Sequence, residues 1–380
     1  MKFLHLSDTH LGYHQYGLQE RAADFFDVFN EAVDFALEKK VDFIIHTGDF
    51  FHSSRPSNQI ILQGMEILKR LKDAKIPVFV ISGNHDRGSH VRDVSPLKIL
   101  QPLGLNLIDS GVLEYEGIFI GGLKYISKAG LKQLDFREVL EKFLEKMDEG
   151  FKILMLHQEF QPFFPDSKLN MFSDLPEGFD YVGIGHYHVA QPPSLINGAT
   201  VVYPGSTEFT AYNEKEEEKG KGFYIIEVDN KELRTKFIKF QRRRPFLFYR
   251  FNEENSEQIL KKIKDDLERG QYVKKPVLIL KGTVKDLSYS DIRHLMKNEG
   301  ITEEKFLHMQ VNLAKDQVEN SPEHTIIELE DNLIKKELQK LIGDKDLSEK
   351  VIELIDHLKT IENTDEVKKL LRENPEILDF

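Results

Sequence analysis

The chain has 380 residues, of which 40% are hydrophobic and 31% charged, and it carries a net charge of −12. This length predicts two or three domains, and the composition is typical of a folded protein with a sizeable core. The sequence contains no cysteine, which excludes disulfides, thiolate-held zinc and cysteine nucleophiles. It also lacks the run of about 18 apolar residues that a membrane span needs, and its N-terminus, MKFLHLSDTHLG, is unlike a signal peptide. We therefore expect a cytoplasmic protein.

The negative charge is unevenly distributed. Residues 231–315 contain 20 Lys and Arg against 12 Asp and Glu, whereas residues 316–380 contain 9 against 18. The net charge of the whole chain argues against a nucleic-acid partner. However, a basic segment that lies between an acidic N-terminal part and an acidic C-terminal part indicates domains that differ in their partners.

Apolar runs alternate with amphipathic helices in the first part of the chain. Strands are predicted at 3–6, 41–45, 77–81, 151–156, 181–184 and 222–228, and helices at 21–39 and 60–74. This alternation predicts an α/β domain over residues 1–240, with a sheet that is parallel at first and mixed later. A pair of sheets packed face to face fits the same runs.

The pattern changes after residue 240. Strands at 246–251 and 277–281 and helices at 257–269 and 290–298 predict a small α+β domain over residues 241–315. A polar stretch predicts a linker at 316–328. Leucine and isoleucine then recur every three or four residues, which predicts a helical region over 329–380.

Polar side chains follow five of the predicted strands. Because sites in α/β sheets assemble at the C-terminal ends of strands, we expect these segments to converge. They supply two carboxylates, one amide and four imidazoles as candidate metal ligands: Asp8, His10, Asp49, Asn84, His157, His186 and His188.

This donor set suits two divalent ions. Carboxylate, amide and imidazole ligands fit manganese, zinc or iron. Two such ions about 3.5–4 Å apart can share a carboxylate, activate water and clamp a phosphate. Glycines precede Asp49, Asn84 and His186, and we expect them to allow sharp turns into the site. The residues alone thus predict two-metal phosphoester hydrolysis, without choosing a substrate.

The same segments resemble the calcineurin-like metallophosphoesterase superfamily. Within it they resemble the archaeal form of the DNA double-strand-break-repair nucleases called meiotic recombination eleven, or SbcD in bacteria. The resemblance rests on LSDTHLG (6–12), GDFFHSSRP (48–56), GNHDR (83–87), YPGS (203–206) and KGF (221–223). It is strong over residues 1–240 and limited to layout beyond them. It implies a four-layer α/β fold of two packed sheets flanked by helices, with a small α+β capping domain and a C-terminal helical tail.

The resemblance also implies how the ligands divide. One ion would be bound by Asp8, His10 and His188. The other would be bound by Asn84, His157 and His186. Asp49 would bridge the two.

Two further histidines receive catalytic roles from the resemblance. His85 would lie beside the scissile phosphate as an electrophile or as the proton donor to the leaving oxygen. His52 would contact the phosphate in exonuclease action; a polar loop residue is the alternative. Asp86 is expected to orient His85.

The implied activity is that of a manganese nuclease in double-strand-break repair. It would carry two Mn²⁺ ions per subunit, use metal-activated water, and act as a 3′-to-5′ exonuclease on duplex ends and an endonuclease on single strands. A homodimer would join an SMC-like ABC ATPase with a coiled coil in a heterotetramer on the nucleoid, and residues 329–380 would bind the ATPase. A helical hairpin packed on the parent domain is the alternative for that tail.

Surface contacts are predicted on weaker patterns. Basic residues near the site loops and after residue 240 are candidate DNA contacts, with a solvated basic face as the alternative: Arg55, Arg87, Arg242, Arg243 and Arg244. Phe25, Phe26 and Phe29 on the first helix are candidates for the dimer surface.

Two other functions fit the same ligand set. A phosphomonoesterase or cyclic-nucleotide phosphodiesterase of the same superfamily would use the same metals without needing residues 231–380. A scaffold in which metal only stabilises the fold is the second, and the complete ligand set argues against it.

Overall fold

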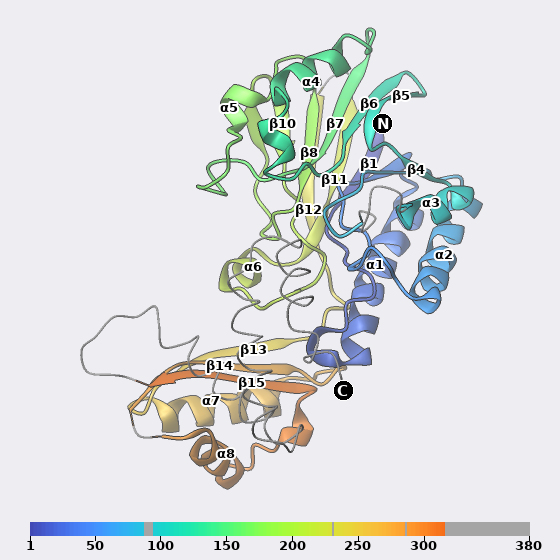
Figure 1. Cartoon of the computed structure of the whole chain (residues 1–380). Coiled ribbons are helices and arrows are strands. Elements are labelled where there is room, and N and C mark those ends of the chain that lie inside the picture. Colours follow the sequence, from blue (N-terminus) through green and yellow to red (C-terminus); the bar gives the residue numbers. More distant parts are fainter. Residues whose placement is uncertain (87–93, 230–231, 286, 316–380) are drawn as a thin grey trace, which may run out of the picture. The chain divides into compact units, whose positions relative to one another are not determined.

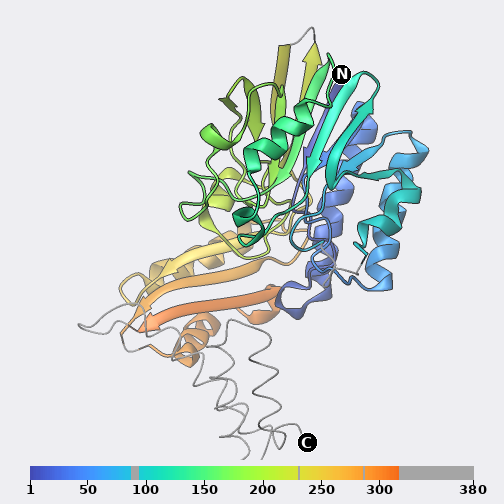
Figure 2. The same cartoon turned by 45° about the horizontal axis from the view of Figure 1, so that its top comes forward.

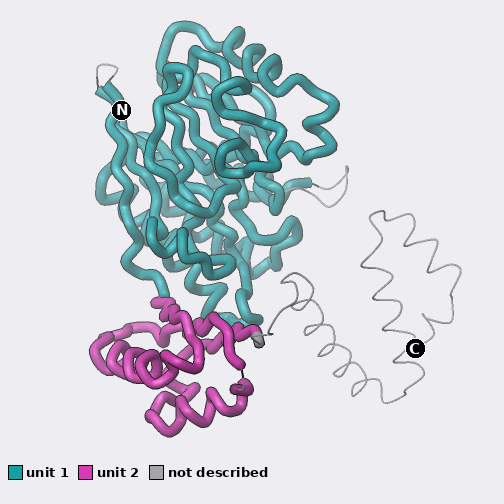
Figure 3. The backbone as a smooth tube through the Cα atoms, turned by 90° about the vertical axis from the view of Figure 1, so that its left-hand side faces the viewer, with its two compact units in different colours: residues 1–244 teal, residues 245–380 magenta. Residues whose placement is uncertain are grey.

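The computed structural model describes residues 1–86, 94–229, 232–285 and 287–315. The chain divides into two compact units, residues 1–244 and residues 245–380 (Figure 3). The division falls after Arg244, whereas the predicted boundary falls after residue 240, so the three consecutive arginines belong to the first unit. The predicted linker at 316–328 and helical region at 329–380 lie outside the described residues. No helix among the described residues is long and apolar enough to cross a membrane.

The first unit contains two six-stranded mixed sheets. The first sheet has the order β12-β11-β1-β2-β3-β4. Its parallel strands are β1 (Lys2–Leu6), β2 (Phe43–His46), β3 (Val78–Val80) and β4 (Leu105–Leu107). Its antiparallel strands are β11 (Gly222–Asp229) and β12 (Glu232–Lys239). The chain thus returns to β1 after completing the second sheet.

The second sheet has the order β5-β6-β7-β8-β10-β9. Its parallel strands are β6 (Ile118–Leu123), β7 (Phe151–His157), β8 (Tyr181–Gly185) and β10 (Ala199–Val202). Two antiparallel strands close its edges, β5 (Ser110–Tyr115) and β9 (Ser194–Ile196).

Helices lie on the outer face of each sheet (Figure 1). The first sheet packs against α1 (Gln19–Lys39), α2 (Asn58–Asp73) and the short α3 (Leu97–Leu100). The second packs against α4 (Phe136–Leu144) and the short α5 (Met171–Asp174). A further short helix, α6 (Glu214–Lys219), precedes β11.

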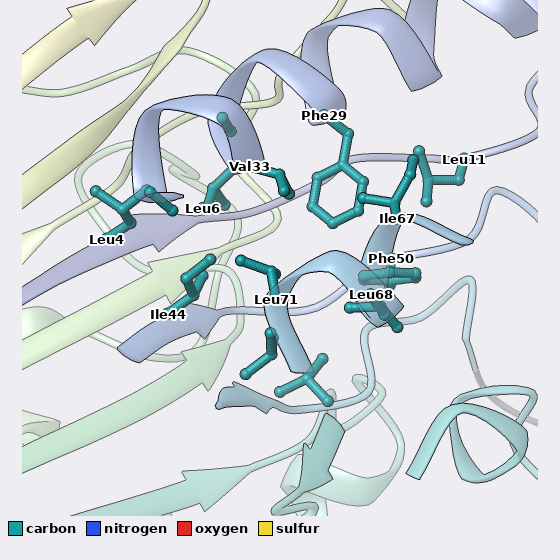
Figure 4. Packing of buried hydrophobic residues seen from close by; sticks show 14 of the residues in the cluster. Leu4, Leu6, Leu11, Phe29, Val33, Ile44, Phe50, Ile67, Leu68 and Leu71 are labelled. Atoms are coloured by element: carbon teal, nitrogen blue, oxygen red, sulfur yellow. The ribbon is translucent and has the colours of Figure 1, made fainter. Parts of the chain in front are cut away.

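Alternation along β1 shows why the sheets pack face to face. Leu4 and Leu6 point to the helix side and lie in one cluster with residues of α1 and α2 (Figure 4). Phe3 points the other way and meets Tyr181 of the second sheet, with ring centroids 5.3 Å apart. His5 bonds the Tyr181 hydroxyl at 2.8 Å. Successive side chains of a strand face opposite sides, so β1 contributes both to the core beneath the helices and to the core between the two sheets. The two sheets therefore pack face to face, and the alternative of a single open sheet is wrong.

The phenylalanines of α1 are part of that core. Phe25, Phe26 and Phe29 are all buried among the residues that cover the first sheet. The prediction that they form a dimer surface is therefore wrong, because their rings stabilise the fold of the subunit itself.

The second unit contains a three-stranded sheet, β13 (Phe246–Phe251), β14 (Val277–Val284) and β15 (His308–Lys315), in which both pairs are parallel. The crossovers contain α7 (Ser256–Arg269) and α8 (Tyr289–Asn298), which lie on the same face of the sheet (Figures 1 and 2).

This arrangement corrects the predicted α+β architecture. Each helix carries the chain back to the starting end of the next strand, and such crossovers place both helices on one face. The result is a βαβαβ unit. The prediction missed β15 although Met309, Val311 and Leu313 alternate with polar residues along it; all three are only partly buried.

The core assignment predicts unequal effects for two leucines of α2. Leu68 is fully buried, whereas Leu62 is 55% exposed. We expect Leu68→Ala to lower the free energy of unfolding by about 2–5 kcal/mol, since it leaves a cavity. In the monomeric subunit, where Leu62 faces solvent, we expect Leu62→Ala to change it by no more than about 0.5 kcal/mol. Urea denaturation followed by circular dichroism measures both, and equal losses would contradict this packing.

Candidate metal centre

The predicted metal-ligating residues lie together at the C-terminal ends of strands from both sheets. The donor atoms of Asp8, His10 and His188 lie within 4.8 Å of one another, and so do those of a second group, Asp49, His157 and His186. The Asn84 side-chain oxygen joins the second group, 3.1 Å from Nε2 of His157 and 3.0 Å from Nδ1 of His186. The structure thus brings all seven donors into two adjacent groups.

Asp49 faces both groups. Its Oδ2 lies 3.8 Å from Nε2 of His10 and 3.5 Å from Nε2 of His157. Its other oxygen accepts a bond from the backbone N–H of His85 at 2.8 Å, which fixes the carboxylate. A carboxylate oxygen between two imidazole donor sets is the arrangement that a shared ligand of two ions requires.

Neighbouring groups orient the imidazoles. His157 Nδ1 donates to the Thr47 carbonyl at 2.7 Å, which leaves Nε2 as the lone-pair donor. His188 Nδ1 lies 3.2 Å from the Thr210 hydroxyl, and the backbone carbonyl of His188 accepts a bond from Nζ of Lys221 at 3.1 Å. Second partners of this kind set the tautomer and direction of metal-binding histidines. The donor chemistry and its supports therefore fit two divalent ions.

The backbone at the site is strained. Asp8, His10, Asp49 and His186 all have positive φ, at 51°, 42°, 54° and 82°. Such left-handed conformations are costly for residues with a side chain and are stored at functional sites. The strand patterns of the sequence carry no signal of this strain.

The glycines before three ligands serve two different needs. Gly48 has φ 96° and makes the predicted sharp turn. At Gly83 and Gly185 the need is space, because an added Cβ would lie 2.1 Å from Asp49 Oδ1 or 2.1 Å from the Thr47 carbonyl. The prediction of a sharp turn is therefore wrong for Gly83 and Gly185, where glycine is needed because neighbouring atoms lie too close for a side chain.

Asp86 ties two loops together. Its carboxylate accepts bonds from the backbone N–H groups of Phe50 at 3.0 Å, Phe51 at 2.9 Å and Gly83 at 3.1 Å. Burial and the neighbouring Asp49 carboxylate raise the pKa of Asp86 to about 7. The expectation that Asp86 orients His85 is wrong, since its carboxylate instead joins the loops after β2 and β3.

His85 and His52 lie beside the first donor group. His85 Nδ1 donates to the His52 carbonyl at 2.7 Å, and the His85 ring meets that of His10 edge-on at 4.9 Å. The His52 ring stacks on Tyr13 at 3.9 Å and on His85 at 5.0 Å. Burial and the nearby His85 lower the pKa of His52 to about 4, so this imidazole is neutral at pH 7.

Charges within the cluster compensate one another. Burial raises the pKa of Asp8 and of Asp49, but hydrogen bonds to the surrounding imidazoles and their charges outweigh it, so both pKa values lie below the usual range. Burial lowers the pKa of His157, but Asp49 beside it raises this pKa to about 9. Without metal, the carboxylates are thus ionised and His157 carries a proton at pH 7.

The predicted DNA-contacting arginines have varied surroundings. Arg244 is buried, and its Nε donates to Asp24 at 2.6 Å. Arg243 donates to Glu217 at 3.1 Å, and Arg242 pairs with Asp34 at 2.6 Å. Arg55 is exposed in the loop that holds His52. Arg87 lies outside the described residues.

Several residues near the ligands were not found from the sequence. Thr210 and Lys221 hold His188, and Glu159 contacts His186, with its Oε1 3.4 Å from Nε2. The polar residue two positions after His157 was the available signal for Glu159. Thr210 lies far along the chain from any candidate ligand, and no spacing rule identifies it. Lys221 belongs to the KGF segment that carries the resemblance, but no role was predicted for it.

Comparisons with known proteins agree with this geometry. Residues 1–190 match the family model described as calcineurin-like phosphoesterase. The DNA double-strand break repair protein Mre11 of Thermoplasma acidophilum is 35% identical over 64% of this chain and 66% of that protein. Its namesake from Saccharolobus solfataricus is 34% identical over 77% of this chain and 78% of that protein.

A third relative, Mre11 of Methanococcus maripaludis, is 37% identical over 59% of this chain and 62% of that protein. The chain thus spans slightly less than two thirds of the Thermoplasma and Methanococcus proteins and more than three quarters of the Saccharolobus one. The family model matches half of the chain, and the Saccharolobus relative is matched over more than three quarters of its length. The chain therefore belongs to the calcineurin-like phosphoesterases and, within them, to the Mre11-type DNA double-strand break repair proteins.

Proposed function

We propose that this protein is a nuclease that hydrolyses DNA phosphodiester bonds at a two-metal centre, with Mn²⁺ as the ion. The observation that carries the proposal is the Asp49 carboxylate, whose Oδ2 faces His10 and His157 of the two donor groups. Such a bridged pair suits in-line displacement at phosphorus. The first ion would be bound by Asp8, His10 and His188, the second by Asn84, His157 and His186.

Divalent ions held by these residues would supply activation of water and compensation of the phosphate charge. The protein's own contribution begins with His85. Because its Nδ1–H is fixed by the His52 carbonyl, Nε2 is the nitrogen available to a substrate oxygen. Transfer of a proton from Nε2 of a doubly protonated His85 to the leaving oxygen would complete the cleavage and leave the neutral imidazole with its proton on Nδ1.

His52 would act differently. Its lowered pKa makes it neutral at pH 7, so it would contact a phosphate as a hydrogen-bond donor and not as a cation. Stacking on Tyr13 and His85 holds its ring in place. We propose that it positions the phosphate during exonuclease action.

DNA is the proposed substrate because the relatives are DNA double-strand break repair proteins by name and because residues 231–315 are basic. We propose 3′-to-5′ exonuclease action on duplex ends and endonuclease action on single strands. Arg55 is the proposed contact beside the site. Among the three consecutive arginines, Arg242 has the most exposed side chain, 50% against 16% and 7% for the next two, and is the best placed to meet phosphate.

We further propose a homodimer that binds an SMC-like ABC ATPase through residues 329–380. For the dimer, α2 and α3 expose Leu62 at 55% and Ile99 at 49%, beside the partly buried Ile61 and Met65. Exposed aliphatic side chains on adjoining helices fit a self-complementary interface.

The nuclease proposal is tested with His85→Ala. The variant keeps every proposed metal ligand, so we expect it to bind Mn²⁺ as the wild type does and to cut labelled linear duplex and single-stranded circular DNA at least ~100-fold more slowly. Intact DNA together with rapid hydrolysis of a phosphomonoester or a cyclic nucleotide by the wild type would identify a phosphatase instead.

Arg55→Ala tests the proposed DNA contact beside the site, and it should weaken DNA binding and reduce the dependence of that binding on salt.

Metal binding should release a proton. His157 is protonated below about pH 9 in the metal-free protein, and a metal requires the neutral imidazole. We therefore expect the affinity for Mn²⁺ to rise with pH up to about 9. Titration calorimetry at pH 7 in two buffers of different ionisation enthalpy measures the released proton, and at pH 9.5 the release should largely vanish. Identical heats in both buffers at pH 7 would contradict a protonated His157.

The proposed partners are separable from catalysis. Deleting residues 330–380 should abolish capture of the ATPase while manganese-dependent cutting continues, because all the proposed metal ligands remain.

Leu62→Glu should convert a dimer into a monomer in light scattering, since it places a charge in an apolar contact. Unchanged ATPase capture or an unchanged mass would remove the respective surface from the proposal.

A further inference from the structure

His186 faces the metal centre through a different nitrogen from its neighbours. His157 presents Nε2 to the second group, and His10 and His188 present Nε2 to each other at 3.2 Å. His186 presents Nδ1, which lies 3.0 Å from the Asn84 oxygen and 3.2 Å from Nε2 of His157. Its Nε2 lies on the far side of the ring, 3.4 Å from Oε1 of Glu159.

Aromatic rings fix the plane of His186 but not its direction. Tyr125 stacks against it with centroids 5.5 Å apart and planes 26° apart, and Phe164 lies tilted at 5.6 Å. A half-turn of the imidazole about its bond to Cβ would keep these face contacts and place a carbon where Nδ1 points at the centre. Ring stacking therefore does not select the nitrogen that a metal needs.

Glu159 supplies that selection. A carboxylate accepts hydrogen bonds and donates none, so it favours the orientation and tautomer in which Nε2 carries the proton. Nδ1 then holds the lone pair and points at Asn84 and His157. The second-group imidazole is thereby oriented by a carboxylate, an arrangement that also increases its strength as a ligand.

The segment that carries Glu159 is itself braced. Its other oxygen lies 3.5 Å from Nζ of Lys128. The intervening Gln158 exchanges two bonds with the backbone of Ile126, accepting at 3.1 Å and donating at 3.0 Å. The side chain of Glu159 is 20% exposed, which is compatible with a fixed position at the rim of the site.

We propose that Glu159 is a positioning residue that selects Nδ1 of His186 as a ligand of the second ion. The inference rests on the proposed two-metal function and adds an asymmetry to it. The ion bound by Asn84, His157 and His186 depends on Glu159, whereas the ion bound by Asp8, His10 and His188 does not, because His188 is held by Thr210 and Lys221 instead.

The test measures Mn²⁺ binding to the full chain by the electron paramagnetic resonance signal of free Mn²⁺. We expect two ions per wild-type chain. In Glu159→Ala one ion should bind about 10–100-fold more weakly and the other unchanged. Glu159→Gln should lose less, since its amide oxygen still accepts a bond from Nε2–H. Glu141→Ala is the matched control, since it removes an exposed carboxylate that pairs with Arg137 on α4, and it should bind both ions as the wild type does.

A metal-independent readout accompanies the binding data. Nitrogen-15 spectra of the imidazoles in the metal-free protein should show a larger Nε2–H fraction for His186 in the wild type than in Glu159→Ala, because the Asn84 oxygen, 3.0 Å from Nδ1, favours the Nδ1–H form once Glu159 is removed. Unchanged thermal melting of the variants excludes a general loss of structure. If Glu159→Ala melts early, Glu159→Met, which keeps the length of the side chain but cannot accept a bond from Nε2–H as a carboxylate does, carries the test through the same spectra.

The outcomes separate the two proposals. A wild type that binds two ions and a Glu159→Ala protein that binds both equally well, with the same His186 tautomer, would overturn the role of Glu159 alone. Equal weakening of both ions would also overturn it, since the effect would then not be specific to His186. A wild type that binds fewer than two ions would overturn the two-metal function and this inference together.

Discussion

Two buried carboxylates dominate the chemistry of the first unit. Asp8 and Asp49 are 0% and 1% exposed, and removing such charges from water costs several kcal/mol each unless they are paired. In the metal-free protein the imidazoles around them, above all protonated His157, provide the compensation. Divalent ions would provide it more fully. The need to offset these charges explains why so many segments converge at one edge of the two sheets.

The convergence depends on how the two sheets meet. Asp8 and Asp49 follow β1 and β2 of the first sheet, whereas His157 and His186 come from β7 and β8 of the second. The backbone N–H of His186 donates to Asp8 Oδ2 at 3.1 Å, and His157 donates to Thr47 at 2.7 Å. The candidate ligands therefore hold the two sheets to each other as well as facing the centre.

Sequence patterns identified the candidate ligands that the structure brings together, because strand ends carry polar residues after apolar runs. Apolar patterns also identified the helices α1, α2, α7 and α8 to within a few residues, and likewise the strands β1, β2, β3, β7, β8 and β11, whereas the buried parallel strand β6 was missed. Patterns failed where partners are far apart in the chain. Thr210 has no local signature. Three strands were overlooked although they have one: Asn197-Gly198 between β9 and β10 is a two-residue hairpin turn, and apolar and polar residues alternate along β15. Arg244 was predicted from charge alone to contact DNA, and its burial against Asp24 was invisible without the tertiary structure.

The left-handed backbone at four ligands has a consequence for which residues can occupy them. Among residues with a side chain, asparagine, aspartate and histidine adopt positive φ most readily. Asp8, His10, Asp49 and His186 are all drawn from that small group. Two requirements therefore restrict the residue at each position: its side chain must carry a suitable donor atom, and its backbone must adopt a positive φ. A glutamate in place of Asp49 keeps the carboxylate but meets a conformation it disfavours, and alanine fails on both counts. The geometry of the main chain narrows the choice of ligands before any metal arrives.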